Sequence, residues 1–145
     1  MRRGFTLIEL LVVLAILTLL LTATPRFLAG MASLRLHSAA DDLVATLRDL
    51  HAVAIREQTT TDFALDPATR SYRLSTGAGA KPLPAIVTRV SLSGVDSSLV
   101  PGESTTRILF YPDGSASGGV IRLQHGNVSA SIAVDWLTGR VRRDD

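Results

Sequence analysis

One continuous apolar segment near the N-terminus limits what this chain can fold into. Residues Leu7 to Ala23 hold a large share of the leucines, isoleucines and valines, and Glu9 is the only charged residue among them. A carboxylate in apolar surroundings is costly unless it has a partner or a purpose. The fold must therefore cover this segment, and the function must explain Glu9.

The rest of the 145-residue chain has room for one modest domain. It contains no cysteine, which excludes disulfides and thiolate metal sites. The formal net charge of +2 depends on Arg2 and Arg3, because 13 basic residues face 13 acidic ones once these two are set aside. Any anionic partner must therefore be recognised by a local cluster of charge.

The N-terminal segment has three interpretations. A secretory signal fits the basic start, but no A-x-A cleavage site surrounds Ala23, and such signals avoid an acid at the position of Glu9. A membrane anchor fits better, because Phe5 to Pro25 supplies about the 20 residues that a helix needs to cross the hydrocarbon. The N-terminal arginines then predict a cytoplasmic N-terminus, with the residues after Arg26 across the membrane.

The third interpretation is a resemblance. Gly4-Phe5-Thr6-Leu7-Ile8-Glu9 is similar to the N-terminal motif of type IV pilin-like proteins, which include the pseudopilins of type II secretion. In that family a short basic leader ends in Gly, a prepilin peptidase cuts after it on the cytoplasmic side, and the new N-terminal residue is methylated. The resemblance implies cleavage between Gly4 and Phe5, followed by methylation of Phe5.

This cleavage would give Glu9 a partner. It creates a positive amine at Phe5, and in a filament of stacked helices the carboxylate of one subunit can neutralise the amine of its neighbour. Low dielectric makes that attraction strong and dependent on register. We therefore interpret Glu9 as an assembly residue, the alternative being an acid that reaches the lipid boundary.

Beyond Pro25, a residue that can kink a helix, the pattern is again helical. From Leu34 onward apolar residues recur at three- and four-residue steps, with the charged residues largely off this stripe. The stripe consists of Leu36, Ala40, Leu43, Leu47, Leu50 and Ala54. This half of the helix is expected to pack on a globular part of the same chain.

From Thr60 the apolar period changes to two, which predicts strands. A hairpin is expected around 63–65 and 72–74, with a turn at Asp66-Pro67-Ala68-Thr69. A loop at 77–84 and a strand at 85–90 follow, and 91–105 receives no assignment. Further strands are expected at 107–111, at 120–124, at 128–136 and around Val141, separated by turns at 112–114, 125–127 and 137–139.

The strand at 128–136 is expected to be half-buried and antiparallel, with alternate residues facing the core. Its inward face consists of Val128, Ala130, Ile132, Val134 and Trp136. The segments 110–115, 118–119 and 134–141 resemble the H-type minor pseudopilin of type II secretion.

The expected fold class is therefore α+β and pilin-like, with a long N-terminal helix packed on an antiparallel β-sheet domain. We expect a leader at 1–4, a transmembrane half-helix at 5–25, an amphipathic half-helix at 26–58 and a periplasmic β-rich domain at 59–145. Such a protein would cross the bacterial inner membrane once.

No catalytic site, metal site or cofactor is expected. The glycine-rich segments lack the strand-to-helix setting and the G-K-[ST] ending that cradle phosphates. His37, His51 and His125 are too scattered to bind zinc, and Asp113 in a Pro-Asp-Gly turn is better explained as a turn residue than as a cation ligand.

The C-terminal arginines leave a second function open. Strand alternation after Gly139 would put Arg140 and Arg142 on one face, with Arg143 adjacent, where they could bind phosphates. A related minor pilin family of DNA uptake has a comparable Gly-Arg-x-Arg ending and binds DNA. The simpler interpretation is a solubilising edge strand, because no aromatic residues for base stacking are interleaved there.

The resemblance implies a minor pseudopilin of the type II protein secretion system, a structural subunit of the pseudopilus or its tip. Its partners would be other major and minor pseudopilins, the prepilin peptidase, the inner-membrane secretion platform and membrane lipid. The alternative is a minor pilin of a type IV pilus or competence system that binds DNA through Arg140, Arg142 and Arg143.

Overall fold

The computed structural model describes residues 6–94 and 106–144, and within the helix it does not describe the side chains of residues 21–29. Over these residues the chain forms one helix, α1 (Leu7–Glu57), followed by eight strands. The strands are β1 (Thr61–Asp66), β2 (Ser71–Leu74), β3 (Ala80–Pro82), β4 (Arg89–Ser93), β5 (Thr106–Phe110), β6 (Gly119–His125), β7 (Val128–Val134) and β8 (Val141–Asp144).

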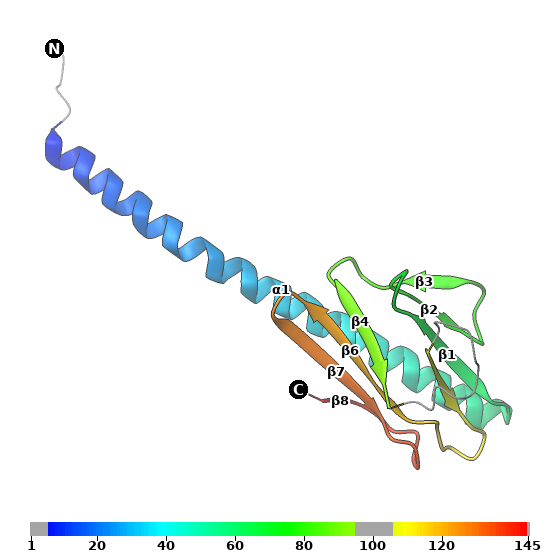
Figure 1. Cartoon of the computed structure of the whole chain (residues 1–145). Helices are drawn as coiled ribbons and strands as arrows, with labels where there is room; N and C mark the ends of the chain where they lie inside the picture. Colours follow the sequence, from blue (N-terminus) through cyan, green and yellow to red (C-terminus); the bar gives the residue numbers. More distant parts are fainter. Residues whose placement is uncertain (1–5, 95–105, 145) are drawn as a thin grey trace.

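The helix α1 has a defined cap at each end. Thr6 is extended and its side chain accepts a hydrogen bond from the backbone of Glu9, whereas Gln58 adopts a left-handed φ of 52° and donates its backbone N–H to Ala54. The helix continues through Pro25. Its N-terminal half projects away from the strands, and its C-terminal half lies along them (Figure 1).

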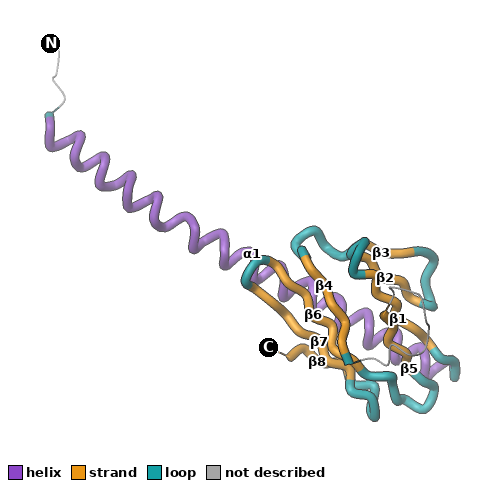
Figure 2. The backbone as a smooth tube through the Cα atoms, viewed as in Figure 1, coloured by secondary structure: helices purple, strands orange, loops and turns teal. Residues whose placement is uncertain are grey.

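The strands form two four-stranded antiparallel sheets. Their orders are β3-β2-β1-β5 and β4-β6-β7-β8. In the first sheet Phe63 of β1 lies opposite Leu74 of β2 and Ile108 of β5. Both sheets rest on the C-terminal half of α1 (Figure 2). The expected α+β class, a long helix on antiparallel strands, is confirmed.

The core lies between the helix and the two sheets. All six residues of the predicted helical stripe are buried, and burial of each leucine side chain among them contributes about 1.5–3 kcal/mol. The strands contribute Phe63, Ile108, Phe110, Ile121, Leu123 and Ile132. Thr61 is a buried polar residue, and its hydroxyl donates to the carbonyl of Leu50 at 3.1 Å, which joins the start of β1 to α1.

Two predicted segments between the hairpin and the undescribed residues are wrong. The expected loop at 77–84 contains β3, which extends the hairpin by pairing Lys81 with Tyr72. The expected strand at 85–90 starts only at Arg89, because the backbone of Val87 donates to Pro84 at 2.9 Å and closes a turn. Val87 is nevertheless buried, so its apolar character reflects packing in a turn rather than in a strand.

The inward face predicted for the strand at 128–136 is only partly correct. Ala130, Ile132 and Val134 are buried, as expected. Strand β7 ends at Val134, however, and Trp136 is 65% exposed. The prediction that Trp136 faces the core is therefore wrong, because the chain leaves the strand at Asp135 and the period of two no longer applies.

Candidate functional site

The N-terminal site residues lie at the free end of α1. Gly4 and Phe5 fall outside the described residues. Thr6 is the N-cap, and its carbonyl accepts hydrogen bonds from the backbone of Glu9 at 3.0 Å and of Leu10 at 3.3 Å. Glu9 therefore lies in the first turn, where the positive end of the helix dipole favours a carboxylate.

Every residue from Thr6 to Leu20 is exposed in the single chain. Glu9 is the one charged residue in this stretch, and most of the others are leucine, isoleucine, valine or alanine. Within the described residues, no helix meets the length and hydropathy that crossing a membrane requires.

Three aspartates organise turns in the β-domain. Side-chain and backbone hydrogen bonds from Thr69 lower the pKa of Asp66 below its ordinary value. Those from Ser115 lower the pKa of Asp113 in the same way. The Oδ1 atom of Asp113 accepts from the backbone of Ser115 at 2.9 Å and from its hydroxyl at 2.6 Å, which fits the interpretation of Asp113 as a turn residue.

Asp135 is the third aspartate of this kind. Its Oδ1 atom accepts the backbone N–H groups of Leu137 at 3.1 Å and Thr138 at 2.9 Å, and the Thr138 hydroxyl at 2.9 Å. The Thr138 backbone bond lowers the pKa of Asp135 most, followed by the Thr138 hydroxyl, with the Leu137 backbone and the charge of Arg142 acting in the same direction.

The histidines have separate environments. His37 lies 3.5 Å from the hydroxyl of Ser33, His51 binds the carbonyl of Gly114 at 2.8 Å, and His125 has a buried Nδ1 with no hydrogen-bond partner. Among the described residues, no three side chains of His, Asp or Glu gather as metal ligands.

The C-terminal arginines divide between two places. Arg140 precedes β8, yet it lines the same depression as Arg142, beside Asp135 and Thr138. Arg143 instead reaches α1, where its Nη1 donates to both carboxylate oxygens of Asp41 at 3.0 and 3.1 Å. The structure thus places Arg140 and Arg142 beside one depression, whereas Arg143 contacts Asp41 of α1.

No pattern in the sequence marks the contacts that join the C-terminal strand to α1. Arg48 donates from Nε and Nη2 to the carbonyl of Val141. One turn further, His51 binds Gly114 and packs against Phe110, with ring centroids 5.4 Å apart. Both residues lie off the apolar stripe, so periodicity alone marks them as a solvated face.

The chain matches two described families. Residues 1–24 match the prokaryotic N-terminal methylation motif, and residues 39–139 match type II transport protein GspH. Type II secretion system protein H of Xanthomonas campestris pv. campestris is 31% identical over 141 residues, which cover 97% of this chain and 82% of that protein.

Two crystal structures of the type IV minor pilin FimU of Pseudomonas aeruginosa share the fold, with TM-scores of 0.54 and 0.53. They are 14% and 13% identical and cover 77% and 76% of this chain, and 89% and 93% of the FimU chains. At this identity the likeness concerns the fold alone. The GspH match spans the C-terminal part of α1 and most of the β-domain, and the chain therefore belongs to the GspH family, the minor pseudopilins of the type II secretion system.

Proposed function

We propose that this minor pseudopilin is cleaved after Gly4, methylated at Phe5 and built into the pseudopilus or its tip through α1. The observation that carries the proposal is the exposed apolar surface from Leu7 to Leu20, interrupted by the single carboxylate of Glu9. A surface of this size needs lipid or neighbouring helices to cover it. Residues 5–25 would be in the inner membrane before assembly, with the N-terminus cytoplasmic and residues 26–145 periplasmic.

Glu9 would set the register between neighbouring subunits. Cleavage after Gly4 leaves an amine at Phe5 close to the helix end, and two such charges are costly apart in an apolar bundle. At about 4 Å and an effective dielectric constant of 20, the pair gains about 4 kcal/mol. A neighbour displaced along the helix loses this pair and exposes both charges to the apolar bundle.

We infer a structural role without catalysis for the β-domain. Asp66, Asp113 and Asp135 hold turns. The side chains of Thr61 and Arg143 join the strands to α1. The partners in this scheme are the prepilin peptidase at the N-terminus, the secretion platform in the inner membrane, and other major and minor pseudopilins along the filament.

The test compares Glu9→Ala with Glu57→Ala in cells that carry the secretion system. Glu57 is an exposed carboxylate at the opposite end of the same helix, so its loss changes net charge equally. We expect both variants to be processed to a chain that begins at Phe5. We expect Glu9→Ala alone to enter sheared pseudopili at least tenfold less than wild type. Equal incorporation of the two variants, or a mature chain that begins elsewhere, would contradict the proposal.

A further inference from the structure

Two large apolar side chains are exposed at the turn between β7 and β8. Trp136 is 65% exposed and Leu137 is 63% exposed. Among the described residues outside α1, these are the large hydrophobic side chains that the fold leaves open to solvent. Adjacent exposed tryptophan and leucine residues are unusual on a domain surface, and tryptophan is enriched where a partner binds.

The turn that carries them, Asp135–Arg140, is held rigidly. The Asp135 carboxylate accepts the three hydrogen bonds described above, and its backbone N–H and carbonyl bind Arg140 and Gly139, both at 2.9 Å. The carbonyl of Trp136 accepts the backbone N–H of Ala116 at 2.9 Å. The backbone that carries Trp136 is therefore held in place, and a backbone that is already ordered loses little conformational entropy when a partner binds.

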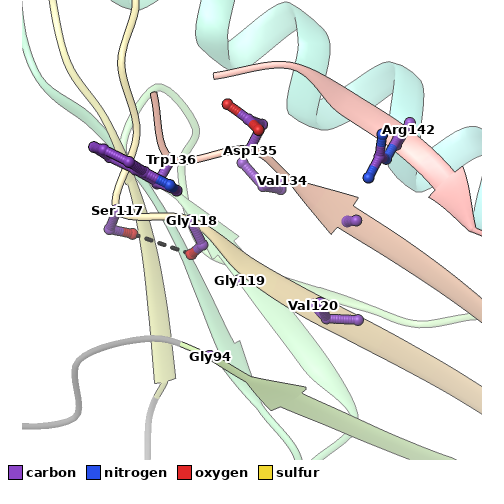
Figure 3. Close-up of a pocket in the computed structure, with 10 residues that line it drawn as sticks. Gly94, Ser117, Gly118, Gly119, Val120, Val134, Asp135, Trp136 and Arg142 are labelled. Atoms are coloured by element: carbon purple, nitrogen blue, oxygen red, sulfur yellow. Dashed lines mark hydrogen bonds between the residues drawn. The ribbon is translucent and has the colours of Figure 1, made fainter. Parts of the chain in front are cut away.

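An open groove of about 440 Å³ runs beside Trp136. Figure 3 shows the indole next to Ser117 and Gly118, with Gly119 and Gly94 further along the groove. Gly118 has a φ of +76°, and a Cβ there would lie 3.0 Å from the Cβ of Trp136. Glycines thus leave the floor beside the indole free of side chains, which makes room for a side chain from a partner.

The other side of the turn is positively charged. Arg48, Arg140 and Arg142 line an open depression of about 450 Å³ together with His51 and Thr138. Asp135 is the one acid on the adjoining depression, so three arginines against one aspartate give a local charge of +2. Arg48 donates to the carbonyl of Val141. Because the Oδ1 of Asp135 already accepts three hydrogen bonds, Arg140 and Arg142 keep donors for an incoming carboxylate.

The turn also lies far from the N-terminal half of α1. It contacts the helix at His51, which is 26 residues beyond Pro25, or about 39 Å of helix. In Figure 1 the β7–β8 turn is on the side of the domain away from the projecting half of α1. With residues 5–25 in the inner membrane, this surface faces away from that membrane.

We propose that Trp136, Leu137, the adjoining groove, Arg140 and Arg142 form a docking site for the globular domain of another pilin-like subunit. The complementary surface presents an apolar side chain, which enters the groove beside Trp136, flanked by carboxylates that bind Arg140 and Arg142. This inference rests on the proposed function for the presence of neighbouring subunits. A protein is favoured over a membrane by the distance from residues 5–25. It is favoured over DNA by the paired apolar side chains and by the attachment of Arg143 to Asp41.

The experiment places a photoreactive benzophenone amino acid at Leu137 of the full chain, in cells that carry the secretion system. We expect a crosslink to another pseudopilin, within a peptide of its globular domain that contains Asp or Glu. Combined Arg140→Glu and Arg142→Glu substitutions should reduce the yield at least tenfold. When the acidic residues in the crosslinked peptide are exchanged for Lys, the crosslink yield of this doubly substituted chain should be restored.

The matched control places the same amino acid at Lys81, an exposed position in β3 of the other sheet. Its crosslinks should not respond to the two arginine substitutions. A Leu137 crosslink to lipid, to DNA or to a second copy of this chain would overturn the proposal, as would a yield unchanged by charge reversal or the absence of any crosslink.

Processing and filament incorporation of the same variants separate the two proposals. A Leu137 variant that begins at Phe5 and enters sheared pseudopili without any crosslink refutes the docking site and leaves the proposed function intact. Failure of the otherwise wild-type chain to be processed or incorporated refutes the proposed function itself.

Discussion

Arg48 of α1 donates two hydrogen bonds to the backbone carbonyl of Val141, from Nε at 3.1 Å and from Nη2 at 2.9 Å. Val141 is the first residue of β8, the last strand of its sheet, and its side chain is buried. One guanidinium thus joins the C-terminal strand to the helix across 93 residues of sequence. The Arg143–Asp41 pair makes a second such connection, but on a more exposed surface.

Replacement of Arg48 by Ala should destabilise the full chain by about 1–3 kcal/mol, because the Val141 carbonyl loses a charged donor. Urea unfolding in detergent, followed by circular dichroism, measures the change. Arg56→Ala is the matched control, since the exposed Arg56–Glu57 pair should be worth less than about 1 kcal/mol. Equal effects of the two substitutions would show that the contact with Val141 contributes nothing.

Gly139→Ala should be more destabilising than its size suggests. Gly139 has a φ of +61°, and a Cβ there would collide with the His51 ring and approach the Gly114 carbonyl to 2.5 Å. Backbone strain of about 1–2 kcal/mol would add to a weakened His51–Gly114 hydrogen bond of about 1 kcal/mol. Thermal unfolding should therefore show a loss of about 2–3 kcal/mol.

Gly126→Ala separates these two contributions. Gly126 also has a positive φ, +55°, but a Cβ there would meet no atom within 4 Å. Its substitution should cost the strain alone, about 1–2 kcal/mol. A Gly139→Ala loss no larger than the Gly126→Ala loss would mean that the collision with His51 is relieved at no cost.

Hydrophobic periodicity was sufficient to predict the parts of the fold that depend on burial. The helical stripe from Leu36 to Ala54 and the alternation from Ala130 to Val134 are buried because a regular element turns the same face to the core at each repeat. Where the chain leaves a regular element, this rule fails. Val87 packs in a turn, and Trp136 follows an aspartate that ends its strand.

The candidate site likewise has features that can be predicted from the sequence and features that cannot. The motif around Glu9 can be recognised from sequence because its residues are adjacent. The contacts of His51 with Gly114 and of Arg48 with Val141 join residues 63 and 93 positions apart, and no local pattern marks such pairs. The close approach of Gly139 to the His51 ring is likewise a tertiary contact that no local pattern marks.

Leu47→Ala tests whether α1 and the sheets share one core. Leu47 is fully buried, whereas Leu34 on the same helix is 72% exposed. Truncation at Leu47 should cost about 2–5 kcal/mol, through lost burial and the cavity that remains. Leu34→Ala should change the free energy of unfolding by less than about 0.5 kcal/mol. A small effect at Leu47 would imply that the helix and the sheets unfold independently.

The Asp135 carboxylate should make the stability of the chain depend on pH in the acid range. Its pKa in the folded state is lowered, chiefly by the Thr138 backbone and hydroxyl, whereas an unfolded aspartate titrates near pH 3.9. The unfolded chain therefore binds more protons between these two pKa values, and stability falls as pH decreases through them. The contribution is complete above about pH 5 and is lost once Asp135 is protonated in the folded state.

Asp135→Asn keeps an acceptor oxygen but removes the charge, so it should be less stable than wild type at pH 7, with a difference that shrinks below pH 4. Urea unfolding at pH 7, 5, 4 and 3 measures that difference, and a value constant across the series would mean that the turn gains nothing from ionisation of Asp135.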